Sequence, residues 1–194
     1  MRLYYFADAC SLATHIALIE AGHDFEAIRV DAATRITEDG RPFAAINAKG
    51  YVPALELDDG TLLTENTAIL DWIAEGAPVL LCDGGMPRTR QIEALAFMTT
   101  EIHKPFLALF FMPVESAKSF IRQQIAGRFD SIAARMDGEF LGGARFGVAD
   151  AFLYVMLRWA RDSDMDLPAP LPAYFQRLDA RPSVRAALAA ESLA

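Results

Sequence analysis

A thiol and a hydroxyl stand side by side near the start of the chain. Cys10 and Ser11 lie between a strand-like run, Arg2–Phe6, and a helical segment, Leu12–Ala21. The free N–H groups and the macrodipole at a helix N-terminus favour an anion. They can stabilise a thiolate, which is either that of Cys10 itself or that of a bound thiol that receives hydrogen bonds from Cys10 and Ser11. Helix capping by Ser11 would also explain the pair.

A proline precedes the next strand-like run. Val52 and Pro53 lie between the loop sequence NAKGY and the apolar run Ala54–Leu57. If this X-Pro bond is cis, the backbone of Val52 faces outward and can pair with an extended peptide ligand. An ordinary trans proline at the start of a strand is the simpler interpretation.

A carboxylate and an amide lie together where a further helix is expected to begin. Glu65 and Asn66 follow Thr64 at the start of a helical pattern. An amino-acid-like zwitterion fits there, with its ammonium on Glu65 and its carboxylate on the backbone N–H and side chain of Asn66. Plain capping by Thr64 or Asn66 accounts for the same residues.

Three charged or titratable side chains fall within one turn of a later helical segment, Gln91–Phe111. Glu101, His103 and Lys104 are close enough to share a face. His103 and Lys104 can hydrogen-bond or balance the charge of a thiolate, since histidine titrates near neutral pH. A solvated helix face with a Glu101–Lys104 pair is the alternative.

The elements that position these residues differ between the two halves of the chain. The first half, residues 1–76, alternates strand-like and helical patterns, which predicts a β-α-β unit with parallel strands followed by a hairpin around Asp58-Asp59-Gly60 and a helix. The expected strands are Arg2–Phe6, Phe25–Asp31, Ala54–Leu57 and Thr61–Leu63, and the expected helices are Leu12–Ala21 and Asn66–Glu75.

The second half, residues 89–194, has helical spacing throughout and follows a linker at 77–88. Asp150 lies three residues after Gly147 and is expected to accept the N–H at 147, a capping contact that serves folding. The expected helices are Gln91–Phe111, Ser116–Met136, Val148–Arg161 and Ala173–Leu178, with a terminal helix in RAALAAESLA.

Composition excludes several classes of protein. The chain has 194 residues, 53% hydrophobic and 23% charged, which is enough apolar material for a substantial core. A net charge of −8 disfavours nucleic acid and anionic membranes as general partners. Two cysteines, Cys10 and Cys82, do not make a disulfide framework or a metal cluster. We therefore expect a cytoplasmic protein without a metal, a signal peptide or a membrane span.

Four segments in order resemble the glutathione transferases, most closely the bacterial beta class. They are LYYFADACSLATHIALIEAG, NAKGYVPALELDDGTLLTENTAIL, EIHKPF and FGVADAFLYVMLRW. The resemblance covers essentially the whole chain. It implies an α/β plus all-α architecture, with a thioredoxin-like N-terminal domain followed by an all-helical C-terminal domain, and a homodimer.

The resemblance also implies roles for individual residues. Cys10 and Ser11 would lie beside the glutathione sulfur, and Val52, before a cis-Pro53, would hold the cysteinyl part by its backbone. His103 and Lys104 would face the sulfur region. The remaining residues expected to bind glutathione are Arg35 at its glycyl carboxylate, Tyr51, Glu65 and Asn66 at its γ-glutamyl end, and Glu101 toward the partner subunit.

The function implied is detoxification: glutathione serves as cosubstrate, and its thiolate attacks a small hydrophobic electrophile. Two alternatives remain open. Cys10 can itself be the nucleophile of a thiol-disulfide or peroxide reductase. Alternatively, the fold serves as a non-catalytic carrier of hydrophobic ligands or contacts a protein partner. Ala96, where relatives often have asparagine, and the altered Phe6–Ala9 turn motivate this last alternative.

Overall fold

The computed structural model describes residues 1–80 and 85–193. The chain divides into two compact units, Met1–Leu81 with Pro182–Ala194, and Cys82–Arg181. Residues 81–84 of the expected linker, Cys82 among them, lie outside the described residues.

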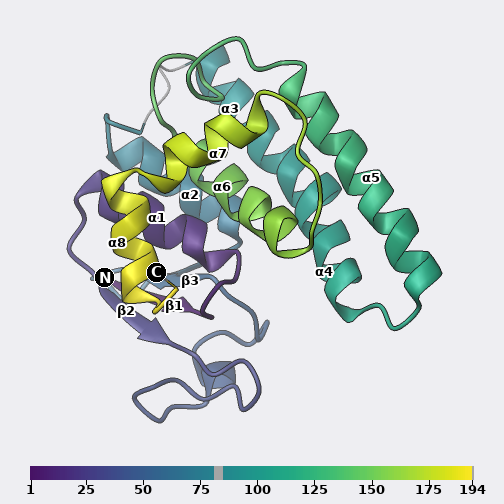
Figure 1. The fold of residues 1–194 in the computed structure, drawn as a ribbon. Coiled ribbons are helices and arrows are strands. Elements are labelled where there is room, and N and C mark those ends of the chain that lie inside the picture. The colour runs from purple at the N-terminus through teal and green to yellow at the C-terminus, as the bar shows by residue number, and fades with distance from the viewer. Residues whose placement is uncertain (81–84, 194) are drawn as a thin grey trace. The chain divides into compact units, whose positions relative to one another are not determined.

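A four-stranded sheet forms the centre of the first unit (Figure 1). Its strands are β1 (Arg2–Tyr5), β2 (Glu26–Arg29), β3 (Ala54–Glu56) and β4 (Leu62–Thr64), in the order β2-β1-β3-β4. β1 and β2 are parallel, whereas β3 is antiparallel to both β1 and β4. The predicted β-α-β pairing and the hairpin are thus confirmed. β1 is flanked by strands on both sides, so the residues that follow it emerge from the middle of the sheet.

Three α-helices and one short 3-10 helix, η1 (Phe43–Ala45), complete the described part of the first unit. The α-helices are α1 (Ser11–Ala21), α2 (Asn66–Gly76) and α8 (Pro182–Ala190). α1 packs against both α2 and α8 and buries every side chain from Ser11 to Leu18. It ends at Gly22, whose φ of 72° is a left-handed conformation that glycine adopts without steric cost.

The C-terminal segment of the chain packs with the first unit. Residues 182–194 group with the first unit, because α8 packs on α1. Polar contacts join α1 to α8 and to the residue that follows α8: Ser183 Oγ donates to Glu20 Oε2 at 2.5 Å, and His15 Nδ1 lies 2.9 Å from Glu191 Oε1. The His15 and Glu191 side chains are both fully buried, so the end of the chain contributes to the interior of the first unit.

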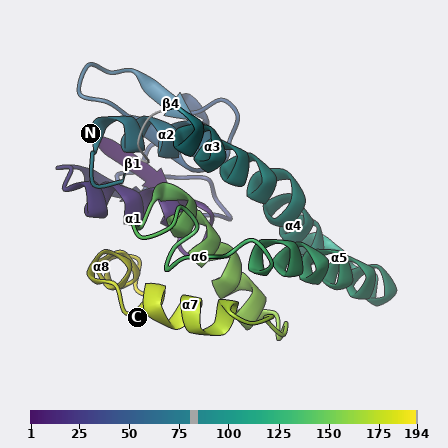
Figure 2. The ribbon, with the colours of Figure 1, turned by 90° about the horizontal axis from the view of Figure 1, so that it is seen from above.

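The second unit is helical, as the spacing predicted. Its long first segment is not one uniform helix, however, because the five residues Thr99–His103 form a wider π-helical turn, η2. Pro105 follows this turn and has no N–H to continue the regular hydrogen-bond ladder. Figure 2 shows α4 beside α5. The helices are α3 (Met86–Met98), α4 (Lys104–Phe111), α5 (Glu115–Ala133), α6 (Val148–Asp162) and α7 (Leu171–Asp179).

A buried carboxyl group organises the start of α6. Asp150 Oδ2 accepts the N–H of Gly147 at 2.8 Å, which confirms the predicted capping contact. Asp150 Oδ1 also accepts the N–H of Leu141 at 2.8 Å and the hydroxyl of Tyr174 at 2.5 Å. Burial raises the pKa of Asp150, and these three hydrogen bonds oppose that effect. Asp150 therefore joins a loop, α6 and α7, in keeping with a role in folding.

Candidate functional site

Cys10 lies immediately before α1, at the end of the turn that follows β1. Its side chain is half-buried, and its Sγ donates to the carbonyl oxygen of Val52 at 3.5 Å. Cys10 takes part in no disulfide bond among the described residues. The N–H groups of Leu12 and Ala13 donate to the carbonyl oxygens of Ala9 and Cys10 at 3.0 and 3.2 Å. The positive end of the α1 macrodipole still makes this position favourable for a negatively charged sulfur.

The turn before Cys10 is held from two sides. Ser11 is fully buried, and its hydroxyl donates to the carbonyl oxygen of Phe6 at 3.2 Å. The backbone N–H of Asp8 donates to Glu191 Oε2 at 3.1 Å. The Ser11 side chain therefore joins the turn to α1, and Glu191 attaches the turn to the C-terminal segment.

The peptide bond between Val52 and Pro53 is cis, as the resemblance implied. Val52 is buried and presents its carbonyl oxygen to the Cys10 thiol. The preceding residue, Tyr51, is exposed, and its hydroxyl donates to Glu65 Oε1 at 3.1 Å. The segment before β3 thus reaches both Cys10 and Glu65.

Glu65 precedes α2 with a φ of 72°, an uncommon conformation for a residue with a side chain. Strained backbone of this kind occurs disproportionately at functional sites. The Glu65 carboxylate forms an ion pair with Lys49, whose Nζ lies 2.7 Å from Oε1. Lys49 also donates to Thr64 Oγ1 at 2.9 Å.

Sequence reasoning missed Lys49. The signal that could have found it is the hairpin register, in which Ala54 pairs with Thr64. This pairing brings the residues just before β3 close to those just after β4.

Asn66, the first residue of α2, uses both ends of its side-chain amide within the protein. Its Oδ1 accepts the hydroxyl of Thr14 at 2.7 Å, and its Nδ2 donates to the carbonyl oxygen of Cys10 at 3.3 Å. These contacts bring the N-termini of α1 and α2 together.

Arg35 lies beside the same group of residues. Its Nη1 donates to the carbonyl oxygen of Gly50 at 2.9 Å, and its guanidinium carbon lies 4.8 Å from the centroid of the Phe6 ring. Its φ of 59° is left-handed, as at Glu65. Arg35 thereby places a positive charge next to both the turn before Cys10 and the loop before Val52.

The other three predicted residues belong to the second unit. Glu101 pairs with Arg128 of α5, with Oε2 and Nη2 2.8 Å apart. Lys104 is exposed at the start of α4.

His103 packs among aromatic rings in the second unit. Its ring is stacked on Trp159 at a centroid separation of 5.6 Å and lies 6.0 Å from Phe152. Burial, and to a lesser extent the charge of Lys104, lowers the pKa of His103 to about 4. The imidazole is therefore neutral at pH 7, able to donate one hydrogen bond and accept another.

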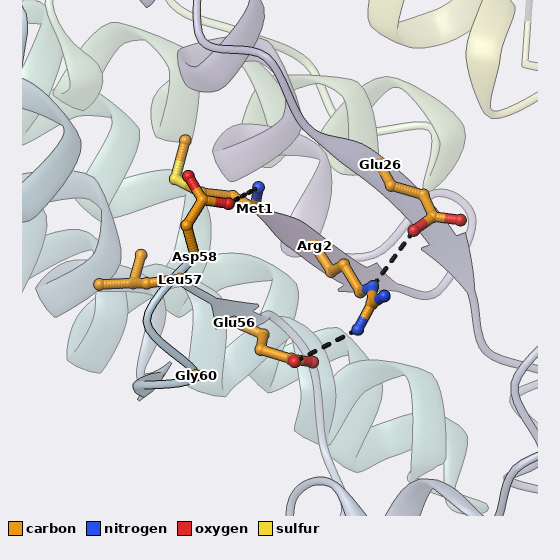
Figure 3. A pocket seen from close by; sticks show the side chains of 7 residues that line it. All are labelled: Met1, Arg2, Glu26, Glu56, Leu57, Asp58 and Gly60. Atoms are coloured by element: carbon orange, nitrogen blue, oxygen red, sulfur yellow. Dashed lines mark hydrogen bonds and ion pairs between the residues drawn. The ribbon is translucent and has the colours of Figure 1, made fainter.

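A separate hollow of about 360 Å³ lies at the other end of the sheet, where β1 begins (Figure 3). The N-terminal ammonium pairs with Asp58 Oδ1 at 2.6 Å, and Arg2 pairs with Glu26 and Glu56 at 3.2 and 3.3 Å. The hollow has two positive groups and three carboxylates, all of them in these ion pairs, and none of its lining residues is among the predicted site residues.

Within residues 1–80 and 85–193, no group of three or more histidine, cysteine or acidic side chains is arranged to hold a metal ion. The helices of the same residues include none that is long and apolar enough to cross a bilayer.

Comparison with known proteins covers almost the entire chain. Residues 9–75 match the glutathione S-transferase N-terminal domain, and residues 87–190 match the glutathione S-transferase C-terminal domain. Glutathione S-transferase GstA of Escherichia coli O157:H7 is 40% identical over 200 residues, which covers 100% of both chains.

Solved structures agree. A sphingomonad glutathione S-transferase complexed with glutathione superposes with a TM-score of 0.93 at 42% identity, covering 100% of both chains. The bacterial beta class glutathione S-transferase of Sphingomonas chungbukensis gives a TM-score of 0.91 at 42% identity, again over 100% of both chains. Both domain matches, in the expected order, and this similarity over the full length show that the chain belongs to the glutathione S-transferase family.

Proposed function

We propose that this protein binds reduced glutathione in its first unit and transfers the glutathione thiolate to a small hydrophobic electrophile. The observation that carries this proposal is the grouping of Cys10, Val52 and Glu65 around the joined N-termini of α1 and α2. A glutathione complex of a sphingomonad relative, 42% identical to this chain, supports it.

Two of the ligand's charged groups have matching partners in this unit. Glu65 offers a carboxylate to the γ-glutamyl ammonium, and Arg35 offers a guanidinium to the glycyl carboxylate. The cysteinyl part would lie along the backbone of Val52 beside cis-Pro53, with Tyr51 next to it. This arrangement supplies local positive charge for an anionic ligand on a chain whose net charge is −8.

The roles expected for Ser11 and Asn66 include hydrogen bonds from their side chains to the ligand. Both side chains make hydrogen bonds within the protein, to Phe6 and to Thr14 and Cys10 respectively. We infer that they contribute through the backbone N–H groups of the helix N-termini, where an anion binds favourably.

The reaction follows from where the sulfur is held. With its thiol near Cys10, glutathione loses a proton to solvent, and the first turn of α1 stabilises the resulting thiolate. The thiolate forms a carbon–sulfur bond with the electrophile as the leaving group departs with its electron pair. Holding both reactants in place supplies much of the acceleration.

The second unit contributes the remaining expected groups. We assign neutral His103 and charged Lys104 to the sulfur region and Glu101 to the partner subunit's glutathione in a homodimer, as the resemblance implies. The apolar side chains of Phe110 and Phe111 on α4 are exposed and suit a hydrophobic cosubstrate. A cytoplasmic location fits this chemistry, since glutathione is abundant in reducing compartments.

The half-buried Cys10 thiol at the N-terminus of α1 favours one further candidate activity. In a thiol-disulfide exchange, the Cys10 thiolate attacks a mixed disulfide of glutathione and releases the other thiol. A second glutathione then attacks the Cys10–glutathione disulfide, giving oxidised glutathione and regenerating Cys10.

Calorimetric titration of the reduced protein with glutathione, together with turnover of 1-chloro-2,4-dinitrobenzene, tests the proposed function. Binding with turnover is the expected result. Cys10→Ala should retain part of the conjugation and lose all disulfide exchange. Loss of both activities in a folded variant would make Cys10 the nucleophile and contradict direct transfer. If the wild type does not bind glutathione, the carrier interpretation replaces the proposal.

A further inference from the structure

Lys49 forms an ion pair with Glu65 but has no part of its own in the function proposed above. Lys49 Nζ donates to Glu65 Oε1 at 2.7 Å and to Thr64 Oγ1 at 2.9 Å, so two of its three protons have acceptors in these contacts. The side chains are 47% and 55% exposed, so a ligand can reach both charges. The hydrogen bond to Glu65 raises the pKa of Lys49, and the lysine is charged at neutral pH.

Lys49 is a cationic side chain that contacts Glu65 directly, and the neighbouring Asn66 and Arg35 side chains have other partners. The amide of Asn66 is used by Thr14 and Cys10. Arg35 is directed to the carbonyl oxygen of Gly50. A ligand ammonium that approaches Glu65 therefore approaches Lys49 as well.

We propose that Lys49 and Glu65 together select a ligand whose head group carries an ammonium and a carboxylate on the same carbon. This inference rests on the proposed function, since it concerns the γ-glutamyl end of the ligand. In this proposal Lys49 determines specificity: it pairs with the ligand's carboxylate, and Glu65 pairs with the ligand's ammonium.

The selection follows from charge alone. A ligand with only the ammonium is attracted by Glu65 but repelled by Lys49, and it must compete with Lys49 for the same carboxylate. A ligand with only the carboxylate is attracted by Lys49 but repelled by Glu65. The complete head group satisfies both charges and replaces an exposed ion pair, which is a weak interaction that is readily broken.

Two glutathione analogues separate these effects. Glutaryl-cysteinyl-glycine lacks the α-ammonium, and 4-aminobutyryl-cysteinyl-glycine lacks the α-carboxylate. In Lys49→Met, the Kd of the first should rise and that of the second should fall. The ratio of the second Kd to the first should decrease by roughly tenfold, as expected for one charge removed at contact distance in a partly solvated site. Calorimetry on the full-length protein measures all four constants.

Two further variants serve as controls. Lys49→Arg keeps the charge and should keep the ratio within about twofold of the wild type. Arg29→Met removes an exposed positive charge from β2, at the opposite edge of the sheet from β4, and should leave the ratio unchanged.

If Lys49→Met changes the Kd values of both analogues equally, or changes neither, the inference is overturned. Normal glutathione binding by the wild type would then leave the proposed function intact. A wild type that binds neither glutathione nor the analogues would overturn the proposed function and this inference with it.

Discussion

Removing the buried carboxyl group of Glu191 should destabilise the protein and loosen the turn before Cys10. The Glu191 side chain is completely inaccessible and contacts both His15 Nδ1 at 2.9 Å and the N–H of Asp8 at 3.1 Å. In Glu191→Ala, His15 stays buried without this partner, which costs about 1–3 kcal/mol. The lost contact to Asp8 and the space left by the side chain bring the expected loss to about 3–4 kcal/mol.

Urea unfolding followed by circular dichroism measures this loss, which corresponds to a decrease in Tm of about 6–16 °C for a chain of this size. Glu191→Gln keeps the volume and two polar atoms, and should lose about 1–2 kcal/mol. Asp24→Ala removes an exposed carboxylate from the same unit and should change stability by less than about 0.5 kcal/mol.

The effect on the turn can be measured separately. The amide hydrogen of Asp8 should exchange faster in Glu191→Ala than in the wild type, because its acceptor is gone. If the free energy of unfolding of Glu191→Ala is within about 0.5 kcal/mol of the wild-type value, the supporting role assigned to this buried contact is refuted.

Lowering the pH from 7 to 4 should destabilise the fold through His103, because the unfolded chain binds a proton near pH 6.5 and the folded chain only near pH 4. The contribution of His103 to the free energy of unfolding is therefore fully present above pH 6.5 and falls by about 3 kcal/mol as the pH decreases to 4. If the stability of His103→Gln depends on pH as steeply as that of the wild type, this assignment is contradicted. Asp150→Ala removes the acceptor of two buried donors and one partly buried donor and should cost about 3–5 kcal/mol in urea unfolding. Asp150→Asn keeps one side-chain oxygen and should cost less, so equal losses in the two variants would show that hydrogen bonding is not the cause.

The helices and strands could be predicted from the sequence because local patterns specify them. Alternation of apolar runs with turn residues predicted the sheet and hairpin, and Gly22 marked the end of α1. The short helix at Phe43–Ala45 was missed because one turn carries no periodicity. The π-helical turn at Thr99–His103 was missed because the apolar spacing around it is that of a regular helix. Pro105 was the one local sign of an interruption.

The candidate site was predictable to the level of residue types. Cys10 and Glu65 were found because each precedes a helix, a position that is visible in the sequence. The side-chain partners were not predictable. Glu101 pairs with Arg128 of α5 rather than with Lys104 in its own helix, since a contact between helices depends on how they pack.

The sequence by itself determined the order of the elements, the two kinds of domain and the positions at which a thiol and a carboxylate precede helices. Those features depend on residues close together in the chain. Only the tertiary structure decided that Lys49 contacts Glu65 and that Glu191 supports the turn beside Cys10. These pairs are 16 and 183 residues apart. Hydrogen bonds and ion pairs act over a few ångströms, so their partners are set by folding and carry no signature in the local sequence.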